Sequence, residues 1–332
     1  MSSTTQSPSQ PQLSMRPWLA RLHPGLFGIP LGLLGLSSSW QRLAYFGGDF
    51  SSGIAHSLLM VALTILGILL LLSTAKLIAH PSKYKQEFTH PVLGALMALM
   101  PVSCLIAVVI LRPTHPEWQL IASVVIGLCL MLQAAIAWQI VAQLSTGQMP
   151  AELISPALYV PIVPGGFVGA MALNSIGLPG FAMLLMGMGV GGWALLEMRI
   201  LNRLFSGPLL MELRPTLGIE IAPAAVGGLA MATIWPDLST DFIMIGLGIA
   251  SGPMLAVLTR WRWWSATPFS ANFWSFSFPL AAVASSVVEA VRRGAWPPAV
   301  AYVAVLLVSS LVLFLAVRTL ILLLTGRLLP QI

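Results

Sequence analysis

Charged residues are scarce in this sequence: Asp, Glu, Lys and Arg together make up 8% of its 332 residues. A soluble domain carries about 25% charged residues, so this chain lacks the polar surface that water requires. Apolar residues make up 57%, the mean hydropathy is +0.90, and apolar runs of about 20 residues recur along the chain. The sequence therefore predicts an all-α polytopic membrane protein.

Cysteine and catalytic motifs are also scarce. The chain has two cysteines, Cys104 and Cys129, both inside apolar runs, so it offers no disulfide framework and no spacing typical of a metal site. It contains no HExxH motif, no nucleophile with a matched base and no glycine-rich phosphate loop. We expect no enzyme activity, no cofactor and no bound metal. The basic residues are scattered through short connections, which excludes a nucleic-acid surface.

The first residues carry no charge. The stretch MSSTTQSPSQPQLS lacks the basic segment that begins a signal peptide. Its Ser, Thr, Gln and Pro composition is typical of disorder. We therefore expect residues 1–20 to form a disordered cytoplasmic tail before a transmembrane domain at residues 21–328.

The apolar runs predict ten membrane spans, separated by short polar breaks. They begin near His23, Gly53, His90, Trp118, Pro156, Gly180, Pro215, Asp241, Phe269 and Pro297. Short connections make consecutive spans antiparallel neighbours.

The basic residues predict the orientation. With ten spans both termini lie on one side, and 12 of the 16 Lys and Arg residues then fall on that side. Arg42, Arg112, Arg292 and Arg293 fall on the other. By the positive-inside rule both termini are cytoplasmic.

Prolines mark alternate spans. The odd-numbered spans contain Pro30, Pro101, Pro161 with Pro164, Pro223 and Pro279, whereas only Pro253 interrupts an even one. A proline kinks a helix and frees a carbonyl that needs a partner away from lipid. This favours five hairpins, with five kinked inner helices around a pore and five straight outer helices. The alternative is that the prolines only pack at helix contacts.

One aromatic residue stands out in the ninth span. In a helix the face of Phe278 also holds Ser275 and Ala282, whereas Phe276 shares a face with other large apolar residues. A phenyl ring projecting from a wall of small residues predicts a pore gate, because an apolar constriction blocks ions. The alternative is a core aromatic residue packed beside the kink.

The seventh span contains the only carboxylate that we place deep in a span, Glu220, whose face includes Gly227. An intramembrane Glu marks a pathway, a proton site or a structural pair. We expect no Lys or Arg deep in an odd span, so anion selectivity would depend on pore width and helix dipoles.

Five segments together resemble the tellurite-resistance/C4-dicarboxylate transporter (TehA) family, which is related to the plant guard-cell slow anion channels. They are HPGLFGIPLGLLGL, HPVLGALMALMPVSCLIA, SPALYVPIVPGGFVGAMA, LRPTLGIEIAPAAVG and PFSANFWSFSFPLAA, in order over about residues 22–328.

The resemblance implies a homotrimer, with a separate pore through each protomer. Phe278 matches the family's gating phenylalanine, and Phe27 with Gly28 matches a pair along the same pore. The chain departs from the bacterial pattern at Pro279, where close bacterial relatives have Gly, and at Glu220, where they have an uncharged residue.

We therefore expect a passive channel or permease for small inorganic or organic anions, in a plasma membrane and most simply a bacterial inner membrane. The alternative is a proton-coupled exporter of C4-dicarboxylates, sulfite or tellurite-related anions that uses Glu220 as its proton site.

Overall fold

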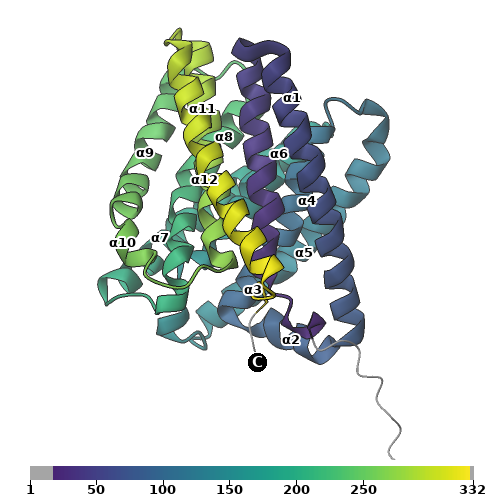
Figure 1. Cartoon of the computed structure of the whole chain (residues 1–332), viewed down its shortest axis with the longest axis vertical. Coiled ribbons are helices and arrows are strands. Elements are labelled where there is room, and N and C mark those ends of the chain that lie inside the picture. The colour runs from purple at the N-terminus through teal and green to yellow at the C-terminus, as the bar shows by residue number, and fades with distance from the viewer. Residues whose placement is uncertain (1–17, 330–332) are drawn as a thin grey trace, which may run out of the picture.

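The computed structural model describes residues 18–329, and every regular element in that range is a helix (Figure 1). The α-helices are α1 (Gly28–Ala79), α2 (Pro81–Thr89), α3 (Pro91–Met97), α4 (Leu99–Leu111), α5 (Gln119–Ser145), α6 (Val163–Ser175), α7 (Pro179–Phe205), α8 (Ala222–Ile234), α9 (Thr240–Thr259), α10 (Trp261–Trp264), α11 (Ser277–Gly294) and α12 (Pro298–Leu324). The 3-10 helices are η1 (Leu19–Arg21), η2 (Pro24–Phe27), η3 (Pro116–Trp118), η4 (Ala151–Leu153), η5 (Pro156–Tyr159), η6 (Met211–Ile221) and η7 (Ala271–Phe276). The predicted tail at residues 1–20 lies almost entirely outside the described residues.

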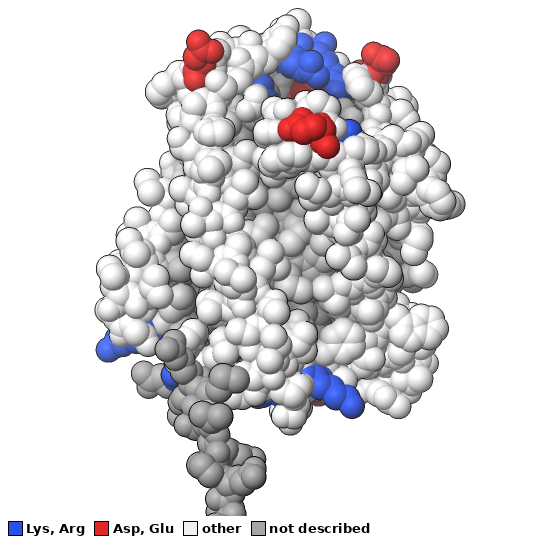
Figure 2. Space-filling model, turned by 90° about the vertical axis from the view of Figure 1, so that its right-hand side faces the viewer, with Lys and Arg blue, Asp and Glu red and all other residues white. Residues whose placement is uncertain are grey.

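The described residues contain 9 helices, or continuous 3-10 and α segments, that are long and apolar enough to cross a membrane. Their outer surfaces are rich in exposed large apolar side chains, such as Leu128, Met188 and Leu307. In Figure 2 the charged side chains gather at the two ends of the molecule and leave an uncharged band between them. The prediction of an all-α polytopic membrane protein is confirmed.

Helix α1 is too long for one crossing. Its 52 residues would extend about 78 Å if straight, against a hydrocarbon core of about 30 Å. The helix is interrupted at Gly48, which has φ 53°, a left-handed value that glycine adopts at no steric cost. Figure 1 shows the two limbs of α1 side by side, meeting at the upper end of the bundle.

Burial alternates along the chain. The first limb of α1, α4, α6, α8 and α11 are largely buried, whereas the second limb of α1, α5, α7, α9 and α12 expose most of their surface. The five buried helices contact one another in a closed order: α1 packs on α4, α4 on α6, α6 on α8, α8 on α11, and α11 on α1. The hydrophobic core of the protein therefore lies between these five helices.

Each buried helix is preceded by a short helical segment and a break within the same span. A 3-10 segment precedes α1, α6, α8 and α11, and the short helix α3 precedes α4. Pro30, Pro101, Pro164, Pro223 and Pro279 all stand within the first turn of the α-helix that follows. The first turn tolerates proline because its N–H groups have no partner inside the helix. The break therefore comes just before each of these prolines, and Pro161 lies in the connection before α6.

Candidate pathway at the centre of the bundle

A narrow cavity of about 40 Å³ lies among the five buried helices, at the level of their breaks. One first-turn residue from each helix lines it: Gly28, Leu99, Pro164, Ala222 and Phe278. A water needs about 10–15 Å³ of such space, so the cavity is only a few water molecules in size. Its polar side chains are uncharged, Thr216, Asn272 and Ser275, and no Lys, Arg, Asp or Glu of the described chain lines it.

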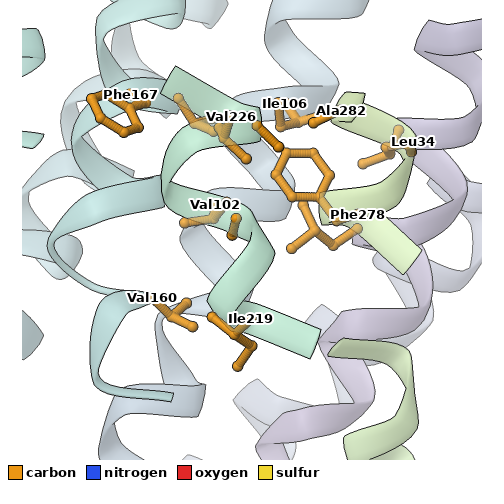
Figure 3. Packing of buried hydrophobic residues seen from close by; sticks show 14 of the residues in the cluster. Leu34, Val102, Ile106, Val160, Phe167, Ile219, Val226, Phe278 and Ala282 are labelled. Atoms are coloured by element: carbon orange, nitrogen blue, oxygen red, sulfur yellow. The ribbon is translucent and has the colours of Figure 1, made fainter. Parts of the chain in front are cut away.

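Phe278 closes the upper side of this cavity. Its side chain is 5% exposed, and Figure 3 shows the ring extending away from α11 toward Val226 of α8 and Ile106 of α4. Val226 and Ile106 are buried and belong to the packed core above the cavity. The ring therefore stands where the open space ends and tight packing begins.

Close approach of α1 fixes the position of this ring. A methyl group added at Gly35 would stand 2.9 Å from Cδ2 of Phe278 and 3.1 Å from Cβ of Ala281. One turn further along, the Ser39 hydroxyl donates to the Ala281 carbonyl (2.9 Å) and bonds to the Ser285 hydroxyl (2.9 Å). Small residues and these bonds hold α1 and α11 together behind the ring.

The structure brings together only part of the predicted site. Gly28, Ser275 and Phe278 line the cavity, and Ala282 packs in the cluster around the ring. Phe27 lines a different, smaller cavity, beside His23 and Lys76. Gly227 faces the ring of Phe167, whose Cε2 lies 3.0 Å from the position of an added methyl group.

Phe276 lies outside the cavity lining. It is 2% exposed and packs on Trp264, with ring centroids 4.3 Å apart. Phe273 lies near the same tryptophan, at 6.1 Å. Phe276 and Phe278 therefore differ in what their rings contact although they are two residues apart.

Carbonyls freed at the breaks are bonded by side chains. The amide of Gln133, a buried residue of α5, donates to the carbonyls of Val160 (3.1 Å) and Pro161 (2.8 Å). The Ser275 hydroxyl donates to the Pro215 carbonyl (2.5 Å). Such bonds satisfy carbonyls that lipid could not satisfy. Sequence reasoning missed Gln133, although one amide in an otherwise apolar run was a usable signal.

Glu220 lies away from the cavity, in a cluster between η5, η6 and α7. The Tyr159 hydroxyl hydrogen-bonds Glu197 Oε2 closely and lies 3.4 Å from Glu220 Oε1, and Trp193 Nε1 also donates to Glu197 (2.9 Å). Glu220 Oε2 is buried without a hydrogen-bond partner in the described chain. Sequence reasoning missed Tyr159 and Glu197.

One expectation about charge in the spans was wrong. Glu220 is not the only carboxylate within a span: Glu197 lies in α7, and Glu289 lies in α11 and is 4% exposed. Near the upper end of the first limb of α1, Arg42 forms an ion pair with Glu289 (2.5 Å). Sequence reasoning counted Arg42 only as a topology signal.

Comparisons with known proteins show which sequences this chain is similar to. The chain is 28% identical over 266 residues to the "Tellurite resistance protein TehA homolog" of Haemophilus influenzae, a match that covers 80% of each chain. It is 24% identical over 299 residues to the "Guard cell S-type anion channel SLAC1" of Arabidopsis thaliana, and 24% identical over 286 residues to the "S-type anion channel SLAH2" of the same plant. These matches cover 84% and 82% of this chain but only 51% and 53% of the plant proteins.

The family model described as "SLAC1: Voltage-dependent anion channel" matches residues 21–322, which include all the helices of the bundle core. Its members are anion channels and not enzymes. The expected resemblance to the TehA and guard-cell channel proteins is confirmed. This multi-pass membrane protein belongs to the SLAC1 family of anion channels and transporters.

Proposed function

We propose that the protein is a passive channel for small anions, that its pathway follows the axis of the five buried helices, and that Phe278 gates this pathway. The observation that carries the proposal is the position of the Phe278 ring, at the upper limit of a cavity to which all five helices contribute. Residues Gly28, Ser275 and Ala282 form the wall beside it.

The uncharged lining suits conduction. A cavity without Lys or Arg binds an anion weakly, so the ion leaves as readily as it enters. All five buried α-helices run in the same direction, so the positive ends of their dipoles face the lower end of the bundle and favour an anion entering there. The ring of Phe278 then blocks passage, because an ion must shed its water to pass an apolar constriction.

In the proposed topology, the two limbs of α1 and the other eight spans make ten crossings arranged as five hairpins. The exposed helix of each hairpin faces lipid. Both termini are cytoplasmic, because 12 of the 16 basic residues lie on their side. The channel domain is residues 21–328, and the protein sits in a bacterial inner membrane as a homotrimer.

The test is anion flux through purified protein in liposomes. Phe278→Ala is expected to raise chloride and nitrate flux by about tenfold or more, because it removes the constriction. Phe276→Ala is the matched control: it deletes an equally buried ring that packs on Trp264, and it is expected to leave flux near the wild-type level. Equal flux through wild type and a folded Phe278→Ala variant would show that Phe278 does not gate the pathway.

A proton-coupled carrier is the second candidate, favoured by the Glu220–Tyr159–Glu197 cluster. One hydroxyl proton lies between two carboxylates there, which is an arrangement that can hold and release a proton. A carrier of this kind would show malate or sulfite flux driven by a pH gradient and abolished by Glu220→Gln. Flux that is indifferent to the pH gradient, in wild type and in Glu220→Gln, would favour the channel.

A further inference from the structure

A cluster of arginines surrounds one buried carboxylate at the upper end of the bundle. Glu289 Oε1 accepts from Arg42 (2.5 Å), and its Oε2 accepts from Arg292 (2.6 Å) and Arg293 (3.1 Å). The second terminal nitrogen of Arg42 donates to the Thr233 hydroxyl of α8 (2.9 Å). Arg42 therefore connects three of the five inner helices: its own helix α1, α11 and α8. Figure 2 shows basic side chains grouped at this end of the molecule.

Helix periodicity places this connection on the pathway side of the bundle. Glu289 is 11 residues after Phe278 in α11, and Thr233 is 11 residues after Ala222 in α8, so each lies within about 20° of a residue that lines the cavity. Gly35 faces the Phe278 ring, and Arg42 is 7 residues after it. Arg42 therefore lies within about 20° of Gly35 around the axis of α1. The Arg42–Glu289 pair therefore lies above the ring, with Glu289 about three turns beyond Phe278 and Arg42 about two turns beyond Gly35 on the same helix faces.

The arginines differ in how many of their N–H groups have a hydrogen-bond partner. Arg293 also donates to the carbonyls of Ala232 (2.9 Å) and Leu238 (3.0 Å), which ties it to the end of α8 and to the connection that follows. Arg42 is different, because its Nε is buried and has no hydrogen-bond partner in the described chain. Arg42 thus keeps an unused donor inside the cluster.

An anion that leaves through the upper end of the bundle needs a positive charge near the Arg42–Glu289 pair. The five inner helices end here, so the negative ends of their dipoles repel it. Three guanidinium groups share a single carboxylate, which leaves the cluster with a net positive charge that opposes this repulsion. The side chain of Arg42 is 22% exposed and that of Glu289 is 5% exposed, so solvent screens the pair only in part.

We propose that Arg42 and Glu289 form a second barrier and anion-binding site above Phe278. In the closed arrangement the Glu289 carboxylate occupies the Arg42 guanidinium and holds α1, α8 and α11 together. A small inorganic anion, such as chloride or nitrate, binds the same guanidinium in place of the carboxylate. Glu289 therefore competes with the permeating anion. This proposal rests on the proposed channel function and on the same pathway.

The experiment uses the full chain carrying Phe278→Ala, in which the lower barrier is removed, and measures chloride flux in liposomes as chloride concentration is raised. Glu289→Gln is expected to lower the half-saturating chloride concentration by about threefold or more, because it removes the competing charge. Arg42→Gln is expected to raise it by a similar factor. Arg112→Gln is the matched control, because Arg112 bonds to Gln119 and to the His115 carbonyl instead, and it is expected to change nothing.

Loss of an ion-pair partner can impair folding. A second measurement therefore compares a positive and a negative charge at position 42 within one protein sample, the Arg42→Cys variant. A cationic methanethiosulfonate reagent restores positive charge at this position and is expected to recover chloride affinity, whereas an anionic reagent is expected to lower flux further. Identical responses to the two reagents would overturn the proposal, as would half-saturation that is unchanged in both Glu289→Gln and Arg42→Gln. If Phe278→Ala itself carries no flux, the proposed channel function fails instead.

Discussion

Gly35 of α1 lies directly against the ring of Phe278, since a methyl group at Gly35 would stand only 2.9 Å from Cδ2 of that ring. The contact joins the first limb of α1 to the residue proposed as the gate. It also means that the ring cannot move toward α1. In the proposed gating, the ring therefore opens the pathway by turning away from α1 or by moving together with α11.

Gly35→Ala tests this contact. Overpacking is expected to destabilise the wild type by about 1–3 kcal/mol and to do so much less in Phe278→Ala, where the ring is absent. Unfolding temperature in detergent measures the difference. Gly67→Ala is the control, because Gly67 has open space around it, and it is expected to leave the protein as stable or slightly more stable. Equal losses from Gly35→Ala with and without the ring would show that the two residues are not coupled.

Gln133 supports the broken inner helix α6 from the outer helix α5. Gln133→Leu leaves the carbonyls of Val160 and Pro161 without this buried donor and is expected to destabilise the protein by about 1–3 kcal/mol. Gln143→Leu on the same helix removes one exposed bond, to the Thr89 carbonyl, and is expected to cost less. The comparison of the two unfolding temperatures decides whether the break near Pro161 depends on α5.

Much of the fold could be predicted because apolar length and proline position are local properties. The predicted starts at Pro156 and Pro297 lie within one residue of the observed segments Pro156–Ser175 and Pro298–Leu324. A start near Gly53 was also expected, and the second limb of α1 begins after Gly48. The 3-10 segments were not expected. Proline indicates a break in a helix but does not show whether the turns before it are tight or regular.

The candidate site was only partly predictable, for a different reason. Phe278 stood out because its neighbours on one helix face are small, which periodicity alone shows. The Arg42–Glu289 pair and the Tyr159–Glu197 bond join residues 247 and 38 positions apart. One sequence does not show which helix faces which, so these side chains could only be counted as topology signals or overlooked.

A buried ion pair joins the second limb of α1 to α2. Lys76 is 2% exposed, and its Nζ donates to Glu87 (2.8 and 2.6 Å) and to the Leu22 carbonyl (2.6 Å). Glu87→Ala leaves a buried charge without its carboxylate and is expected to destabilise the protein by about 3–5 kcal/mol. The double variant Lys76→Met, Glu87→Leu is expected to recover much of this loss, measured by unfolding temperature. If the double variant is as unstable as Glu87→Ala, the packing of the two stems matters more than their charges.

His23 makes stability depend on pH at this same end. It precedes η2, its Nδ1 accepts from the Gly25 N–H (3.0 Å), and burial together with the nearby Lys76 charge lowers its pKa to about 4. Because the pKa is 6.5 in an exposed histidine, the unfolded chain binds this proton more readily than the folded one. The stabilisation is therefore complete above about pH 6.5 and is lost as pH falls toward about 4.

His23→Asn keeps an acceptor for the Gly25 N–H but removes the titration, so its unfolding temperature is expected to fall less than that of the wild type between pH 7 and pH 5. His56→Asn, at an exposed position of α1, is the control and is expected to keep the wild-type slope. A wild-type slope in His23→Asn would show that other groups, such as His90, whose pKa burial also lowers, carry the acid sensitivity.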